Sequence, residues 1–233
     1  LAEDPSIGIF NNNINGTVNN SSDIISGKNS INIYNKGGQI NHLLGNIEVG
    51  EKGTGIYTSS GSVKLTSGTL NLNGIAAVGV YGTNNAIIDI NAKINVSQES
   101  YGMVLIGESD LTNRDVSTLA DKGVLLYSDG NVNVKNEYGA NINVAGSNSI
   151  GFYMKNGGTL VNKAEIIGNS GIGNIGIYNK SGNIDNSGNI KIGNSLIIDP
   201  QNPFVNEYAV GIYGDGVKNI KNTGNIEVGA NAV

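Results

Sequence analysis

The chain has 233 residues, of which 14% are charged, and a formal net charge of −5 at pH 7. Ordinary domains carry about 25% charged residues, so neutral polar side chains must cover most of this surface. The negative charge disfavours a nucleic-acid partner, which needs a basic stripe. The absence of cysteine excludes disulfides and thiolate metal sites. No apolar run approaches the roughly 18 residues of a membrane helix, so we expect a segment that is not embedded in a membrane.

A short apolar strand that opens with glycine, usually followed two residues later by an aromatic residue, recurs along the chain. The opening position is occupied by Gly8, Asn32, Gly55, Gly79, Gly102, Leu125, Gly151, Gly176 and Gly211. The spacing is about 24 residues, except for a longer last step. Units this short cannot each bury a core, so they must stack on one another.

Within the units the apolar residues alternate with polar ones, as they do from Ile88 to Val96 and from Ile220 to Val228. A period of two indicates strands with one buried face. Leucine-rich repeats need a leucine framework that is absent from this sequence, and propeller blades need about 40 residues. We therefore predict an all-β, right-handed parallel β-helix (solenoid) of about nine coils. The right hand is an extension of the crossover rule for parallel strands.

Residues 1–233 are predicted to form a single β-helix segment with irregular loops at 107–122 and 194–208. The first loop has the highest charge density in the chain. Leu111–Asn113 could form a degenerate strand there, and Asp115–Leu119 could form one helical turn. The second loop contains two of the three prolines, which remove hydrogen-bond donors from a sheet.

Three columns of side chains follow from the spacing. The aromatic column consists of Phe10, Tyr34, Tyr57, Tyr81, Tyr127, Tyr153, Tyr178 and Tyr213. The core column in the alternate phase consists of Ile56, Val80, Phe152, Ile177 and Ile212. If the core column points inward, the aromatic column stacks outside, either as a structural element or as a glycan-binding strip. Asn162, Asn186 and Asn222 predict an inward or corner asparagine ladder.

Charged residues and the one histidine yield smaller predictions. Asp185 should lie beside Lys221 on adjacent coils, and Lys191 beside Glu227, which is stabilising across neighbouring strands. His42 is the only histidine, and we expect it at the surface or in a turn. Without cysteine or a second histidine a zinc site is not expected, so we predict no metal and no cofactor.

The repeated Gly-Ile-Tyr strand, the Asn-Ser/Thr-Gly-Asn-Ile step at 186–190 and 222–226, and the lack of cysteine resemble the passenger domains of type V autotransporters. In repeat style the chain is most similar to the large fusobacterial outer-membrane autotransporter adhesins. The resemblance implies a passenger displayed at the cell surface and carried by an outer-membrane β-barrel expected outside this chain. It implies attachment to proteins or glycans on host cells or other bacteria. It transfers no functional residue.

The chain stops where the next unit would begin and shows no signal peptide, so we interpret it as a segment of a longer passenger. We expect a rigid stalk or adhesin segment that is non-catalytic. One alternative is a carbohydrate-active β-helix enzyme of the lyase or tailspike kind, which needs paired carboxylates in one groove. The other alternative is a pure structural spacer.

We place the candidate partner-binding residues on the two predicted loops, because recognition residues concentrate on loops. In the first loop Arg114 is a bidentate donor flanked by Asp110 and Asp115. In the second, Phe204 and Tyr208 are expected to form an aromatic anchor stiffened by the neighbouring prolines.

Overall fold

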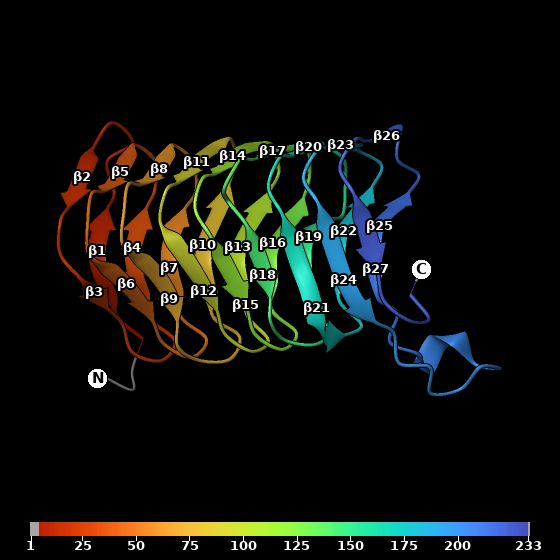
Figure 1. Cartoon of the computed structure of the whole chain (residues 1–233). Helices are drawn as coiled ribbons and strands as arrows, with labels where there is room; N and C mark the ends of the chain where they lie inside the picture. Colours follow the sequence, from red (N-terminus) through yellow and green to blue (C-terminus); the bar gives the residue numbers. More distant parts are fainter. Residues whose placement is uncertain (1–4, 233) are drawn as a thin grey trace.

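The computed structural model describes residues 5–232, and within that range it is all-β with no α-helix. Three nine-stranded sheets run along the molecule, and each sheet takes every third strand of the chain. Neighbouring strands within the sheets are parallel, as in β4 (Ile31–Asn35) beside β7 (Thr54–Thr58). Residues 5–232 therefore wind through nine stacked coils (Figure 1). The predicted parallel β-helix with roughly 24 residues per coil is confirmed.

Each coil contributes one strand to each of the three sheets. The first sheet contains β1 (Ile7–Asn11), β4, β7, β10 (Val78–Thr83), β13 (Tyr101–Ile106), β16 (Val124–Asp129), β19 (Ile150–Met154), β22 (Ile175–Lys180) and β25 (Val210–Asp215). The second contains β2 (Thr17–Asn20), β5 (Gln39–His42), β8 (Ser62–Leu65), β11 (Ala86–Ile90), β14 (Ser109–Asn113), β17 (Val132–Asn136), β20 (Thr159–Asn162), β23 (Asn183–Asn186) and β26 (Asn219–Asn222). The third contains β3 (Ile24–Ile25), β6 (Asn46–Val49), β9 (Thr69–Leu72), β12 (Lys93–Val96), β15 (Ser117–Leu119), β18 (Ile142–Val144), β21 (Ile166–Ile172), β24 (Ile190–Asn194) and β27 (Ile226–Val228).

The core lies between the three sheets and confirms the predicted phase of the first sheet. Ile56, Val80, Phe152 and Ile177 are completely buried. Ile212 is only partly buried, because no described coil covers that end. The aromatic column consequently lies on the outer face, as predicted.

Where a unit opens with glycine, the next coil approaches the backbone closely. A Cβ atom added to Gly55 would lie 2.5 Å from the carbonyl oxygen of Gly79, and one added to Gly176 would lie 2.6 Å from that of Gly211. Real side chains do not approach a backbone oxygen so closely, so glycine suits a site where backbones nearly touch.

The predicted asparagine ladder is present, and it is longer than expected. The ladder consists of Asn113, Asn136, Asn162, Asn186 and Asn222. Each Nδ2 donates to the Oδ1 of the next asparagine at 2.8, 2.8, 2.6 and 2.7 Å in chain order. The first four members are completely buried, so the ladder satisfies amides that would otherwise be costly inside. It starts at Asn113, whose Oδ1 has no partner among residues 5–232, because Ile90 occupies the preceding place.

His42 lies inside the solenoid, so the expectation of a surface or turn position was wrong. Its side chain is buried, with Nδ1 at 2.9 Å from Nδ2 of Asn20 and Nε2 at 3.1 Å from the carbonyl oxygen of Gly45. It occupies the same inward column as Leu65 in the next coil. Two nearby polar groups allow a histidine to be buried there.

The prediction of an irregular loop at 107–122 was also wrong, because the chain continues there as a regular coil. Strands β14 and β15 pair with the coils on both sides. Leu111 and Leu119 point into the core, whereas the charged residues fall on outward positions and corners. The helical turn considered for Asp115–Leu119 is replaced by a corner and a strand. The dense charge lies on the outside of this coil and does not interrupt it.

The loop at 194–208 does leave the solenoid, as expected from its prolines. It lies between β24 and β25, contains the short 3-10 helix η1 (Pro203–Val205), and extends from the lower right of the body in Figure 1. An antiparallel bridge joins Leu196 to Glu207 at its base. The loop is therefore a closed excursion whose two ends lie side by side.

We expect this 233-residue chain to associate with itself as its concentration rises. Within residues 5–232, each sheet ends in a strand with a neighbour on one side only, and Phe10 and Ile226 are 59% and 42% exposed there. Unpaired strand edges template further pairing. Sedimentation should show a mass that grows with concentration, and Ile7→Lys combined with Ile226→Lys should reduce this growth. A monomer at all concentrations would contradict the prediction.

Candidate binding site

The structure gives each of the three charged candidates a different partner. Arg114 donates from Nε to Oδ1 of Asp89 at 2.7 Å, on the preceding coil. Asp110 accepts from Nδ2 of Asn133 at 3.1 Å on the following coil. Asp115 accepts from the backbone N–H of Val116 at 2.7 Å. Arg114, predicted as a bidentate donor for a partner, is thus engaged by Asp89, and the three candidates do not converge on one another.

The loop at 194–208 exposes an apolar tip on a well-bonded base. Phe204 is 96% exposed, and its backbone N–H donates to Oδ1 of Asn202 at the start of η1. Asn206 ties the loop together, because its Oδ1 accepts from the backbone N–H groups of Ile198 and Asp199 at 2.8 and 3.0 Å. The phenol oxygen of Tyr208 accepts from Nδ2 of Asn206 at 3.0 Å. Phe204 therefore forms the tip, while Tyr208 supports the base.

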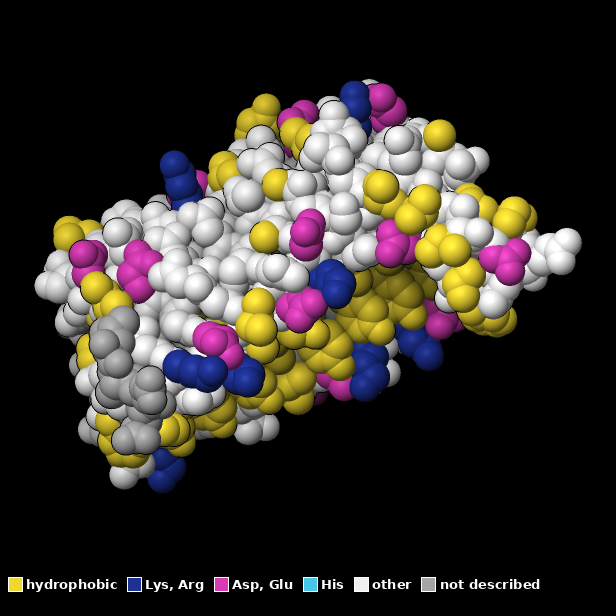
Figure 2. Space-filling model, turned by 90° about the horizontal axis from the view of Figure 1, so that it is seen from below, with side chains coloured by type: hydrophobic (Ala, Val, Ile, Leu, Met, Phe, Trp, Pro, Cys, Tyr) yellow, Lys and Arg dark blue, Asp and Glu magenta, His cyan; other side chains and the backbone are white. Residues whose placement is uncertain are grey.

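The aromatic column forms a row of stacked rings on the first sheet. Neighbouring centroids lie 4.6–5.5 Å apart with small interplanar angles, as in Tyr153 and Tyr178 at 4.6 Å and 5°. The row is interrupted at Val104, where Tyr101 contacts Tyr127 edge-on. Figure 2 shows a band of hydrophobic side chains along the molecule with lysine or arginine beside it. Because stacked rings cover each other's faces, they present mainly edges to a ligand, which favours the structural interpretation.

Burial raises the pKa of Tyr178 within this row, and the neighbouring Tyr153 adds to the effect. The Tyr178 phenol therefore stays protonated at neutral pH. It can act as a neutral donor and acceptor along the edge of the row.

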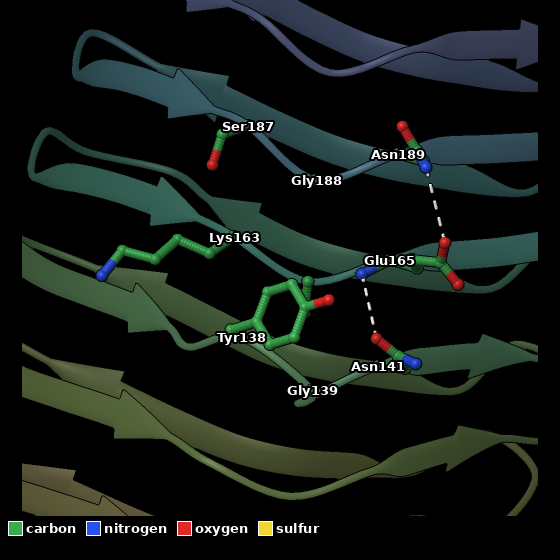
Figure 3. Close-up of a pocket in the computed structure, with 9 residues that line it drawn as sticks. Tyr138, Gly139, Asn141, Lys163, Glu165, Ser187, Gly188 and Asn189 are labelled. Atoms are coloured by element: carbon green, nitrogen blue, oxygen red, sulfur yellow. Dashed lines mark hydrogen bonds between the residues drawn. The ribbon is translucent and has the colours of Figure 1, made fainter.

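A separate hollow of about 330 Å³ lies at the corner between the second and third sheets (Figure 3). Its lining comes from corners of three successive coils and consists of Tyr138, Gly139, Asn141, Lys163, Ala164, Glu165, Ser187, Gly188 and Asn189. The hollow is thus formed by residues about one repeat apart that the stacking brings together. None of these residues was among the predicted site residues.

The hollow owes its shape to a longer corner in one coil. Asn136 and Ile142 are six positions apart, whereas Asn162 and Ile166, their partners in the next coil, are four apart. The two extra residues are Tyr138 and Gly139, at the centre of a turn closed by the Ala140 N–H donating to the Glu137 carbonyl at 3.1 Å. Gly139 has φ +86°, as position three of a type II turn requires.

The longer corner is visible in the sequence as a lengthened unit. This extra length is the sequence signal that could have located the hollow. The turn holds Tyr138 outside the solenoid, where it is 89% exposed. No stacked aromatic row covers it, in contrast to the tyrosines of the first sheet.

Polar side chains line the hollow along the direction of stacking. Asn141 accepts through Oδ1 from the backbone N–H of Glu165 at 3.1 Å, and Asn189 donates from Nδ2 to Oε1 of Glu165 at 3.4 Å (Figure 3). Lys163 donates from Nζ to Oε2 of Glu137 at 2.9 Å. This hydrogen bond lowers the pKa of Glu137, although burial acts in the opposite direction. The lysine is therefore held at the side of the hollow beside an ionised carboxylate.

Within residues 5–232 no cluster of three or more histidine, cysteine or acidic side chains could hold a metal ion. In the same part of the chain, no helix has the length and apolarity needed to cross a bilayer. No family model, curated protein or solved structure matches the chain. The fold and the geometry of these surfaces are therefore the basis for a functional proposal.

Proposed function

We propose that this chain is a rigid, non-catalytic rod segment of a surface-displayed autotransporter passenger, and that it contacts its partner through the loop at 194–208. The observation that carries the proposal is the exposed, well-bonded apolar tip on an otherwise regular solenoid. Coils are constrained by the coils above and below them, whereas a loop that leaves the solenoid is free to vary for recognition. The resemblance to autotransporter adhesins supports display at the cell surface.

Charge pairs between neighbouring coils line the outer surface of the rod. Lys221 and Asp185 lie 3.1 Å apart, and Lys191 and Glu227 lie 3.0 Å apart, as the sequence predicted. Each exposed pair contributes little to stability, but these contacts engage carboxylates that a glycosidase would need to leave available. The pairing of these carboxylates favours a structural role for the outer surface of the coils over a catalytic one.

The loop has properties that suit a protein partner. Leu196, Ile198 and Val205 are 42%, 59% and 44% exposed beside the fully exposed Phe204. Aromatic side chains that enter a partner's pocket tend to dominate interface energy. The internal hydrogen bonds of Asn206 fix the loop before binding, which reduces the entropy lost on association. Between 194 and 208 the charged residues are Asp199 and Glu207, so we expect a partner whose apolar pocket has a basic rim.

The test is a loop deletion that preserves the base. Replacing 197–206 with Asn-Gly keeps the Leu196–Glu207 bridge and closes it with a two-residue hairpin turn. We expect this variant to lose binding to partner cells at least about tenfold while its circular dichroism stays unchanged. Phe204→Ala should reproduce most of the loss if the aromatic tip is the anchor.

The matched control is Phe10→Ala, which truncates an exposed phenylalanine on the first coil. It should leave cell binding unchanged. Full binding by the loop-deletion variant, with its fold intact, would contradict the proposed contact and favour a pure spacer.

A further inference from the structure

We propose that the hollow beside Tyr138 is a saccharide-binding subsite that holds one or two neutral sugar rings of a glycan. This inference goes beyond the proposed loop contact and does not depend on it. It rests on the exposed ring of Tyr138, on the polar side chains around it, and on a hollow of about 330 Å³. This volume is at the lower end of ligand sites, which span roughly 300–1,000 Å³.

The ring of Tyr138 is placed where a sugar could stack. At 89% exposure it contributes almost no burial to the fold, yet the type II turn at Gly139 holds its backbone in a defined geometry. Figure 3 shows the ring lying between the corner of its own coil and the corner that carries Lys163 and Glu165. The face of an aromatic ring carries partial negative charge. It therefore attracts the polarised C–H groups on one face of a pyranose.

The polar groups around the ring match the hydroxyl groups of a sugar. Among residues 5–232, Oε2 of Glu165 and Nδ2 of Asn141 make no hydrogen bond to the protein, so one acceptor and one donor are free. On the next coil, Asn189 keeps one N–H, because its amide already donates to Glu165 and accepts from the backbone N–H of Asn225 at 3.1 Å. The Ser187 hydroxyl donates to the Asn162 carbonyl oxygen at 3.4 Å and can still accept. Each sugar hydroxyl is both a donor and an acceptor. A row of mixed donors and acceptors beside an aromatic face therefore suits vicinal hydroxyls better than an apolar ligand.

The charges of the lining disfavour other ligand classes. Lys163 and Glu165 carry opposite charges, and Lys163 already donates to Glu137. A phosphate or nucleotide would need unpaired basic groups, and a lipid would need an apolar lining. The hollow provides neither. A neutral saccharide is the ligand class that meets the fewest unfavourable contacts.

The floor of the hollow is fixed by small residues and by the stacking of the coils. A Cβ atom added to Gly188 would lie closer to the Ala164 carbonyl oxygen than any real side chain can approach. No larger side chain can therefore fill the floor at Gly188 without moving the corner. Ala164 is buried beneath the hollow. The site is preformed, which lowers the entropic cost of binding.

The experiment uses the full chain and a panel of neutral oligosaccharides ending in glucose, galactose, N-acetylglucosamine or N-acetylgalactosamine. Saturation-transfer NMR should identify at least one binder, and titration should give its affinity. Tyr138→Ala should weaken this affinity at least about tenfold, and Tyr138→Phe should retain most of it because the ring face is kept. Glu165→Gln should weaken it less than Tyr138→Ala, because it removes one free acceptor while the ring face is kept.

The matched control is Tyr213→Ala, which removes a ring that is 45% exposed at the end of the stacked row. It should leave the affinity unchanged. The absence of any binder in the panel, or equal affinity of Tyr138→Ala and the unmodified chain, would overturn the proposal. The loop-deletion variant should bind the same saccharide normally, so failure of the loop contact and failure of this site give different results.

Discussion

Phe152→Ala is expected to lower the free energy of unfolding by about 3–5 kcal/mol, the range for large-to-small changes of buried phenylalanine. Phe152 is completely buried and is the largest side chain in the core. It pairs in register with Leu126 on one side and Ile177 on the other. Truncation would leave a cavity bounded by both neighbouring coils. Urea unfolding followed by circular dichroism measures the change.

Phe204→Ala is the control for this measurement, because it makes the same chemical change at a side chain that is 96% exposed. We expect it to change the unfolding free energy by less than about 0.5 kcal/mol. Stacked repeats need not unfold in one step, so the comparison should use the whole unfolding curve. Equal effects of the two substitutions would show that the assigned core phase is wrong.

Asn162→Ala is expected to destabilise the chain by about 2–5 kcal/mol, through loss of partners for buried amides. Asn162 accepts from Asn136 at 2.8 Å and donates to Asn186 at 2.6 Å. It also donates to the carbonyl oxygen of Ala164 at 2.9 Å. Removing it would leave Oδ1 of Asn186 without its donor in a water-free interior. Thermal and urea unfolding should both show the loss.

Asn222→Ala provides the matched comparison at the end of the same ladder. Asn222 is exposed, and Asn186 keeps its bond to the Gly188 carbonyl oxygen when Asn222 is absent. Water can replace the missing partner there, so we expect a cost of about 1 kcal/mol or less. A loss as large as that of Asn162→Ala would mean that burial does not determine the ladder's contribution.

The sequence alone determined the coil length, the strand periodicity and the inward or outward phase of most positions. The physical reason is that contacts in a solenoid join residues about one repeat apart. The pairing of Ile177 with Ile212, of Asp185 with Lys221 and of Asn186 with Asn222 could therefore be obtained by aligning repeats. The proline-containing excursion at 194–208 was predictable for a related reason, since proline cannot donate to a sheet.

Other features were decided by the tertiary structure. The charge of Glu108–Lys122 suggested a loop, but the inward positions of that coil hold leucine, serine and the ladder residue Asn113, which continue the stack. Burial of His42 depends on two partners, Asn20 and Gly45, that are placed by the fold. The local composition of a strand averages its inward and outward residues, whereas only the inward residues have to fit the core.

The site beside Tyr138 shows the same limit most clearly. Its sequence signal is a corner longer by two residues, which by itself predicts only a turn. The hollow exists because the next two coils place Glu165 and Asn189 beside that turn without a matching insertion. Stacking fixed by the core thus converts a difference in corner length into a concave surface. The repeat determined where the coils lie. The mismatch between neighbouring corners appears only in three dimensions, and it decided where the hollow forms.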